Sequence, residues 1–215
     1  MSRRFNLFLF DLDGTLINSR KDISGSINRM LKELDLPAKE ESLISTYVGQ
    51  GVNNLIRKSL GDTDEKLFDR ALKLFKRDYD THCLDFTKLY PGVEETLRHI
   101  EGMKVVVTNK PFSYSEKILK GLGIHQYFEL LLGGDMHFAK KPSPEAVYYL
   151  IEKFGNVPKE NILFVGDSLL DIHTAKNSGV MSCGVTYGFG TREELENACP
   201  DYLLDSFGEL LEIVR

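Results

Sequence analysis

The chain has 215 residues, 42% of them hydrophobic, so it is long enough to bury a core as one domain or as a domain with an insertion. Its 27 basic and 32 acidic residues give a net charge of -5, which argues against a basic surface for nucleic acid or anionic lipid. No apolar run approaches the roughly 18 residues that span a bilayer. The cysteines, at positions 83, 183 and 199, lack the spacing of a zinc or redox motif. We therefore expect a cytoplasmic protein that binds neither nucleic acid nor a membrane and whose partner is a small molecule.

Short apolar runs bounded by Gly, Asp or Asn predict buried parallel strands. They lie at 7–10, 105–107, 130–132, 162–165 and 181–185. Helical patterns alternate with them, at 93–100, 113–122, 144–154 and 171–178. This alternation predicts an α/β fold with a doubly wound, Rossmann-like parallel sheet and right-handed crossovers.

The segment that follows the first strand breaks this alternation, because it contains helical patterns and no convincing strand. One helical face holds apolar residues at 23, 27, 30, 31 and 34, and a second holds Leu67, Ala71, Phe75 and Tyr79 at four-residue spacing. We interpret these side chains as packing residues. The pattern predicts an α-helical cap domain at 18–89 inserted into a core domain formed by 1–17 and 90–215, with hinges near 16–20 and 86–91.

Polar clusters follow the predicted strands, at the edge where sheets of this class bind ligands. Their members are Asp11, Asp13, Gly14 and Thr15 after the first strand, Thr108, Asn109 and Lys110 after the second, Lys140 and Lys141 before the helix at 144, and Gly166, Asp167, Ser168 and Asp171 after the fourth. One such cluster is explained equally well by the turn preference of Asp and Gly. Four clusters at one edge indicate a site.

Two aspartates separated by one residue suit attack on phosphorus. The carboxylate of Asp11 can form an acyl phosphate, and Asp13 can protonate the leaving oxygen and later deprotonate water. Phosphoryl transfer also needs donors and cations around the phosphoryl oxygens, and Thr108, Asn109 and Lys141 are of those types.

Asp11 and Asp167 together offer the oxygen ligands that Mg²⁺ prefers. A divalent ion also offsets the repulsion between an anionic nucleophile and an anionic phosphate. The residues therefore predict a magnesium-dependent phosphoryl transfer site.

Four segments resemble the motifs of the haloacid dehalogenase superfamily, in order and at suitable separations. They are Asp11-Leu12-Asp13-Gly14-Thr15-Leu16, Val107-Thr108-Asn109-Lys110, Lys141-Pro142-Ser143-Pro144 and Gly166-Asp167-Ser168-Leu169-Leu170-Asp171. Within the superfamily, the chain is most similar to the phosphoglycolate phosphatase group, through Thr-Asn-Lys, Lys-Pro-x-Pro and Tyr90-Pro91-Gly92-Val93. The inserted helical segment resembles the small α-helical cap of that superfamily.

The resemblance implies a role for each matching position. Asp11 is the expected nucleophile and Mg²⁺ ligand, and Asp13 is the expected acid and base whose backbone carbonyl also binds Mg²⁺. The other implied roles are phosphoryl binding by Thr108, Asn109 and Lys141, metal ligation by Asp167, a direct or indirect metal role for Asp171, and substrate contact by the cap loop Gly49-Gln50-Gly51. Asp171 has an alternative interpretation as a charge that stabilises the start of its helix.

The expected function is hydrolysis of a small phosphorylated metabolite, with 2-phosphoglycolate as the leading candidate by resemblance, by a monomer or a homodimer. A phosphoglucomutase or a pyrophosphatase would share every core motif, and only the cap would separate them. A dehalogenase has no phosphate leaving group for Asp13 to protonate. A catalytically silent binding module would not need all of these positions intact.

Overall fold

The structure is a computed structural model that describes residues 5–155 and 157–214. In these residues, six parallel strands form a sheet in the order β5-β4-β1-β6-β7-β8. The strands are β1 (Leu7–Phe10), β4 (Met103–Val107), β5 (Leu130–Leu132), β6 (Ile162–Gly166), β7 (Met181–Val185) and β8 (Tyr202–Leu204). From β1, the strands β4 and β5 extend the sheet to one side, and β6, β7 and β8 then extend it to the other. This order confirms the doubly wound sheet, and the five predicted strands are all present. The short strand β8 was missed.

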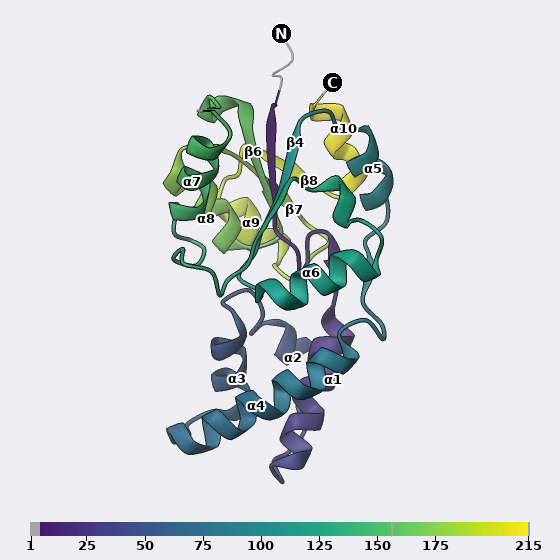
Figure 1. Cartoon of the computed structure of the whole chain (residues 1–215), viewed down its shortest axis with the longest axis vertical. Coiled ribbons are helices and arrows are strands. Elements are labelled where there is room, and N and C mark those ends of the chain that lie inside the picture. The colour runs from purple at the N-terminus through teal and green to yellow at the C-terminus, as the bar shows by residue number, and fades with distance from the viewer. Residues whose placement is uncertain (1–4, 156, 215) are drawn as a thin grey trace.

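Helices cover both faces of this sheet, because side chains of a strand alternate between its faces. Leu7 and Leu9 belong to an apolar cluster with α7 and α8, whereas Phe8 and Phe10 belong to one with α5, α6 and α10. Figure 1 shows α7 and α8 on one side of the strands and α5 and α10 on the other. The core helices are α5 (Val93–His99), α6 (Phe112–Gly121), α7 (Glu145–Lys153), α8 (Leu169–Ser178), α9 (Arg192–Asn197) and α10 (Leu210–Ile213), with short 3-10 turns at His125–Tyr127, Lys159–Asn161 and Phe207–Glu209.

A group of helices, which we call the cap, lies below the sheet in Figure 1, beyond the carboxyl ends of the strands. It consists of α1 (Arg20–Glu33), α2 (Glu41–Ser45), α3 (Val52–Leu60) and α4 (Glu65–His82). The prediction that Leu67 lies on the buried face of α4 was wrong by one position, because Phe68 is buried and Leu67 is only partly so. The buried series Phe68, Ala71, Phe75 and Tyr79 follows the 3.6-residue repeat of a helix more closely than a uniform spacing of four. The domain boundaries at 18 and 89 stay a prediction.

Two short connections join the cap to the sheet. β2 (Ile17–Asn18) pairs antiparallel with β3 (Lys88–Leu89). The buried Asp22 then accepts hydrogen bonds from the backbone N–H groups of Phe86 and Thr87, at 2.7 to 3.0 Å, and from the Thr87 hydroxyl at 2.7 Å. The two connections are therefore held together as one unit beside the carboxyl end of β1.

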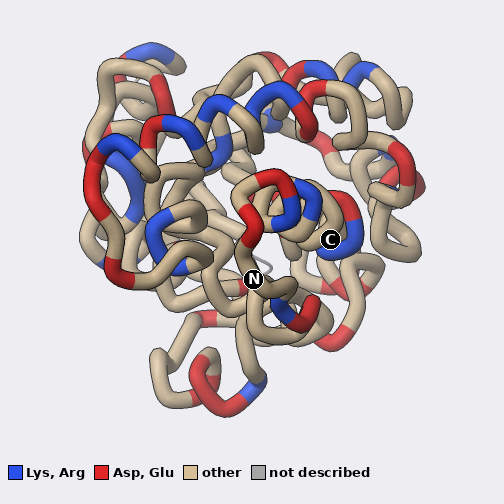
Figure 2. Tube along the Cα trace, turned by 90° about the horizontal axis from the view of Figure 1, so that it is seen from below, with Lys and Arg blue, Asp and Glu red and all other residues tan. Residues whose placement is uncertain are grey.

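Basic and acidic residues are interspersed on the side of the molecule that carries the cap, as Figure 2 shows. Some of these charges pair between helices, because Arg29 contacts Asp78 at 2.7 Å and Arg77 contacts Glu33 at 2.6 Å across α1 and α4. No helix in the described part of the chain is both long enough and apolar enough to cross a membrane.

Candidate active site

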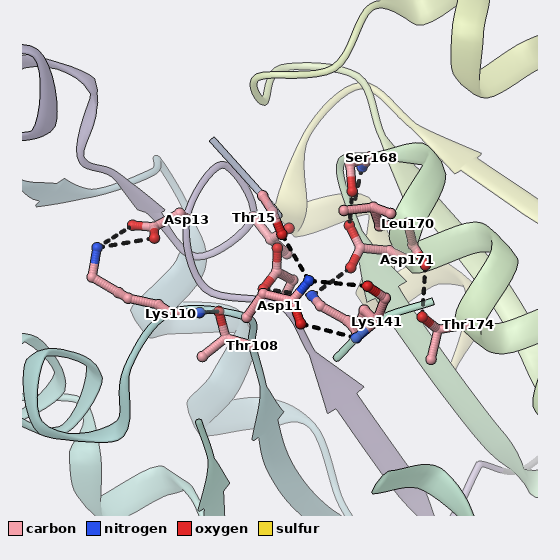
Figure 3. A network of polar contacts seen from close by, with 12 residues as sticks. Asp11, Asp13, Thr15, Thr108, Lys110, Lys141, Ser168, Leu170, Asp171 and Thr174 are labelled. Atoms are coloured by element: carbon pink, nitrogen blue, oxygen red, sulfur yellow. Dashed lines mark hydrogen bonds and ion pairs between the residues drawn. The ribbon is translucent and has the colours of Figure 1, made fainter. Parts of the chain in front are cut away.

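The candidate site lies where the carboxyl ends of three neighbouring strands meet, as expected for a doubly wound sheet. Asp11 follows β1, Thr108 follows β4 and Asp167 follows β6, and all three are buried. The Asp11 N–H still donates to the carbonyl of Val165 at 3.0 Å, so the strand pairing extends to the predicted nucleophile. Figure 3 shows Asp11 close to Lys141 and Asp171, with Thr108 nearby.

Three buried carboxylates gather at this point. Asp11, Asp167 and Asp171 each place an oxygen within 4.8 Å of the others. Burial raises the pKa of Asp11 to about 6, against the opposing effect of Lys141, and burial together with Asp171 and Asp11 raises the pKa of Asp167 to about 7. Asp11 Oδ1 is buried, and the Lys141 ammonium lies 2.7 Å from it. The three carboxylates carry more negative charge than Lys141 alone can balance, and their oxygens are the ligands that a hard divalent cation prefers.

Asp167 is held tightly in one orientation. It accepts hydrogen bonds from Thr15 Oγ1 at 2.9 Å and from the Phe189 N–H at 2.6 Å. A Cβ placed on Gly14 would lie 2.2 Å from Asp167 Oδ2, and one placed on Gly188 would lie 2.2 Å from Asp167 Cβ. Only glycine leaves room for this carboxylate at both positions, and Gly14 also has a φ of +92°, which favours glycine.

Lys141 lies between two of the carboxylates. Its Nζ is 2.7 Å from Asp11 Oδ1 and 2.6 Å from Asp171 Oδ1. Burial alone would lower the pKa of Lys141, but the two carboxylates outweigh it and raise the pKa. The second oxygen of Asp171 accepts from the Ser168 N–H at 3.1 Å and hydroxyl at 2.6 Å, at the start of α8. Both Asp171 oxygens are thus engaged by the protein, an arrangement that positions Lys141 and caps the helix.

The carboxylate of Asp13 points away from Asp11, as Figure 3 shows. Lys110 Nζ contacts its two oxygens at 3.0 and 2.9 Å, and Ser19 Oγ donates to it at 2.6 Å. The same ammonium donates to the Tyr79 hydroxyl at 2.8 Å. The structure therefore separates Asp13 from the cluster of three carboxylates and places it on the side of the cap.

Lys110 had no predicted role of its own, and Tyr79 was predicted only as a packing residue. Tyr79 is buried, as expected, but its hydroxyl also reaches the site. A signal for Lys110 was present, because this residue directly follows Thr108 and Asn109 at the end of β4.

Asn109 connects the cap loop to the sheet. Its Nδ2 donates to the Gly49 carbonyl at 2.7 Å and to the Lys141 carbonyl at 3.1 Å, and its Oδ1 accepts from the Lys141 N–H at 2.9 Å. Gly49 and Gly51 line a cavity between cap and sheet, whereas Gln50 is exposed and does not line it. The structure brings the two glycines of the predicted cap loop to the site and leaves Gln50 outside it.

The comparisons with known proteins agree with this geometry. The model of the haloacid dehalogenase-like hydrolase family matches residues 8–185. The chain belongs to this family. It is 38% identical to a phosphoglycolate phosphatase of Pasteurella multocida, with 99% of each chain covered, and 39% identical to one of Vibrio parahaemolyticus, with 97% of this chain and 95% of the relative covered.

Solved structures show the same relationship within the haloacid dehalogenase-like hydrolases. A crystal structure described as a predicted phosphoglycolate phosphatase from Haemophilus somnus has a TM-score of 0.93 and 37% identity, over 98% of each chain. A structure from Lactobacillus delbrueckii, at 22% identity, shares the fold with a TM-score of 0.89. The resemblance inferred from the four motifs is confirmed, and the chain is a phosphatase of this family.

Proposed function

We propose that this chain is a Mg²⁺-dependent phosphomonoester hydrolase that acts on 2-phosphoglycolate through an aspartyl phosphate on Asp11. The observation that carries the proposal is the placement of Asp11 in a buried cluster of carboxylates with Lys141, next to a cavity of about 50 Å³. Full-length similarity to phosphoglycolate phosphatases supports the substrate. The cytoplasmic location and the monomeric or homodimeric state stay predictions from the sequence.

In the first half of the reaction, a carboxylate oxygen of Asp11 bonds to phosphorus while the ester P–O bond breaks. The electron pair of that bond goes to the leaving oxygen, which takes a proton from Asp13. Thr108 and the Lys141 ammonium stabilise the negative charge on the phosphoryl oxygens. This step requires Asp13 to turn from Lys110 toward the leaving oxygen.

In the second half, a water oxygen bonds to phosphorus and Asp13 takes the proton of that water. The bond between phosphorus and Asp11 breaks, so the Asp11 carboxylate is restored and inorganic phosphate leaves. One residue thus serves as acid and then as base, which is efficient when the protein holds it within reach of both oxygens.

Asp11, Asp167 and the backbone carbonyl of Asp13 are the proposed Mg²⁺ ligands. When bound, Mg²⁺ supplies positive charge that offsets the repulsion between the Asp11 carboxylate and the phosphate. Asp171 holds Lys141 in place through the 2.6 Å contact.

The cap loop is proposed to close over the substrate. The bond from Asn109 to the Gly49 carbonyl joins cap to sheet, and a closed cap keeps bulk water away from the aspartyl phosphate. Gly49 and Gly51 then contact the substrate through their backbone.

The test is a panel of phosphorylated metabolites assayed for kcat/KM with Mg²⁺, including pyrophosphate and a hexose phosphate. We expect the highest kcat/KM for 2-phosphoglycolate and no turnover in EDTA. Asp11→Asn should lower kcat by more than about 10³-fold, whereas Asp69→Asn, at an exposed position of α4, should retain it. Substantial turnover by Asp11→Asn would remove Asp11 as the nucleophile, and a preference for pyrophosphate or for phosphoryl transfer between sugar hydroxyls would replace the proposed substrate.

A further inference from the structure

The lining of the cavity between cap and sheet is largely apolar on the side of the cap and includes few charged residues. Apolar side chains of the cap, among them Ile23, Leu55 and Phe75, form much of its wall. Lys110 is the one basic residue among the described residues that line it. At about 50 Å³ the cavity has room for several water-sized groups. A leaving group that fits here is small and meets one positive charge.

The Lys110 ammonium is buried and uses all three of its donors. Its side chain is 6% exposed, and its partners are the two oxygens of Asp13 and the Tyr79 hydroxyl. The Tyr79 ring is fixed by stacking on Phe75 at 5.3 Å and by an edge contact with Tyr114 at 5.2 Å. The cap therefore holds the hydroxyl that helps to position this ammonium.

The proposed reaction disturbs this arrangement. Asp13 must leave Lys110 to reach the ester oxygen, and two donors of a buried ammonium then lose their partner. An unpaired buried charge is costly, so the turn of Asp13 is unfavourable unless another anion takes its place. In the proposed reaction Asp13 serves both groups in turn, so the ester oxygen would bind within reach of Asp13 and therefore near the Lys110 ammonium.

We propose that Lys110, with the Tyr79 hydroxyl, is the subsite for a carboxylate carried by the leaving group of the substrate. This carboxylate replaces Asp13 on the ammonium and frees Asp13 for proton transfer. Because Asp13 contacts the Lys110 ammonium directly, a carboxylate that takes its place while Asp13 reaches the ester oxygen has to be attached close to that oxygen. In the proposed function, this is the carboxylate of 2-phosphoglycolate. The inference rests on the proposed function and adds the residue that selects the substrate.

The test compares 2-phosphoglycolate with ethyl phosphate, which has two carbons and no carboxylate, in the wild type and in Lys110→Met. We expect the wild type to prefer 2-phosphoglycolate in kcat/KM by more than about 10-fold, and the variant to lose about 10- to 100-fold of that preference, as for a charge-assisted hydrogen bond. The preference is the ratio of kcat/KM for the two substrates, so an effect of the substitution on Asp13 that is the same for both substrates cancels. An equal loss for both substrates would make Lys110 only a support for Asp13 and would overturn the subsite.

Two further variants keep the inference testable if Lys110→Met folds poorly. Tyr79→Phe removes one hydroxyl from the ammonium and should reduce the preference about 3- to 10-fold. Lys66→Met, at an exposed position of α4, should leave the preference unchanged. An unchanged preference in Tyr79→Phe, together with inhibition by glycolate no stronger than by ethanol in the wild type, would overturn the subsite.

The outcomes separate the two proposals. If the wild type with Mg²⁺ hydrolyses neither compound, the proposed function fails and the subsite falls with it. If it hydrolyses both with the same kcat/KM, the phosphatase activity stands and the carboxylate subsite alone is overturned.

Discussion

Lys141 Nζ lies 2.6 Å from Asp171 Oδ1, and both side chains are almost completely buried, at 4% and 0% exposure. The two residues are 30 positions apart in the sequence. Because Ser168 holds the other Asp171 oxygen, the contact fixes the ammonium beside Asp11. This relationship supports a role for Asp171 in positioning Lys141, and Asp167 stays the proposed metal ligand.

Asp171→Asn and Asp167→Asn should therefore differ in their effect on Mg²⁺ binding. If Asp171 acts through Lys141, Asp171→Asn should lower the Mg²⁺ affinity by about 10- to 100-fold. Asp167→Asn removes the proposed ligand and should lower the affinity further. Titration of activity with Mg²⁺, together with the Mg²⁺-dependent rise in Tm, measures both. Equal losses in the two variants would show that Asp171 ligates the metal directly.

Lys141→Met should destabilise the metal-free protein by about 3 kcal/mol at pH 8, because removing one partner of a buried ion pair leaves the other charge unpaired. Urea unfolding in EDTA measures this free energy. Added Mg²⁺ should recover part of the loss by supplying positive charge to Asp11. Lys140→Met, one residue earlier and exposed, is the matched control and should change stability by less than about 0.5 kcal/mol. Equal stability of the two variants in EDTA would contradict a stabilising role for Lys141.

Without a divalent ion, the free energy of unfolding should fall as pH rises from about 5 to 8. Burial raises the folded-state pKa of Asp11 to about 6 and that of Asp167 to about 7, from 3.8. Between these values the folded state binds more protons than the unfolded state, so rising pH favours unfolding. Urea unfolding in EDTA at several pH values measures the slope, and Asp11→Asn should reduce it. A stability that rises over this range would contradict the raised pKa values.

Gly188→Ala should impair metal binding without unfolding the protein, because the added Cβ would meet Asp167 Cβ at 2.2 Å and displace the carboxylate. We expect a loss of at least about 10-fold in Mg²⁺ affinity, measured by titration of activity. Gly208→Ala is the matched control, since a Cβ added there would meet no heavy atom of the described residues within 4 Å. An Mg²⁺ affinity equal to that of the wild type in Gly188→Ala would show that the loop shifts to accommodate the methyl group without moving Asp167.

The sequence by itself determined the features that depend on local patterns. Continuous apolar runs indicated the five strands, and apolar residues at the helical repeat indicated the cap. Both patterns are local, because burial of a strand or of one helix face sets which nearby positions are apolar. The polar clusters after Phe10, Val107 and Gly166 indicated the site, since the carboxyl ends of parallel strands share one edge. The strand β8 was missed; it lies at the edge of the sheet, and only Leu204 of its three residues is buried.

Only the tertiary structure decided where the side chains of the site point. Lys110 contacts Asp13 across 97 positions of sequence and Tyr79 across 31, and Gly188 leaves room for Asp167 from the loop after a different strand. These contacts depend on how the cap packs on the sheet and how the loops approach one another. A repeat within one segment carries no information about contacts between distant segments. The partner of Asp13 and the lining of the cavity could therefore be identified only from the folded structure.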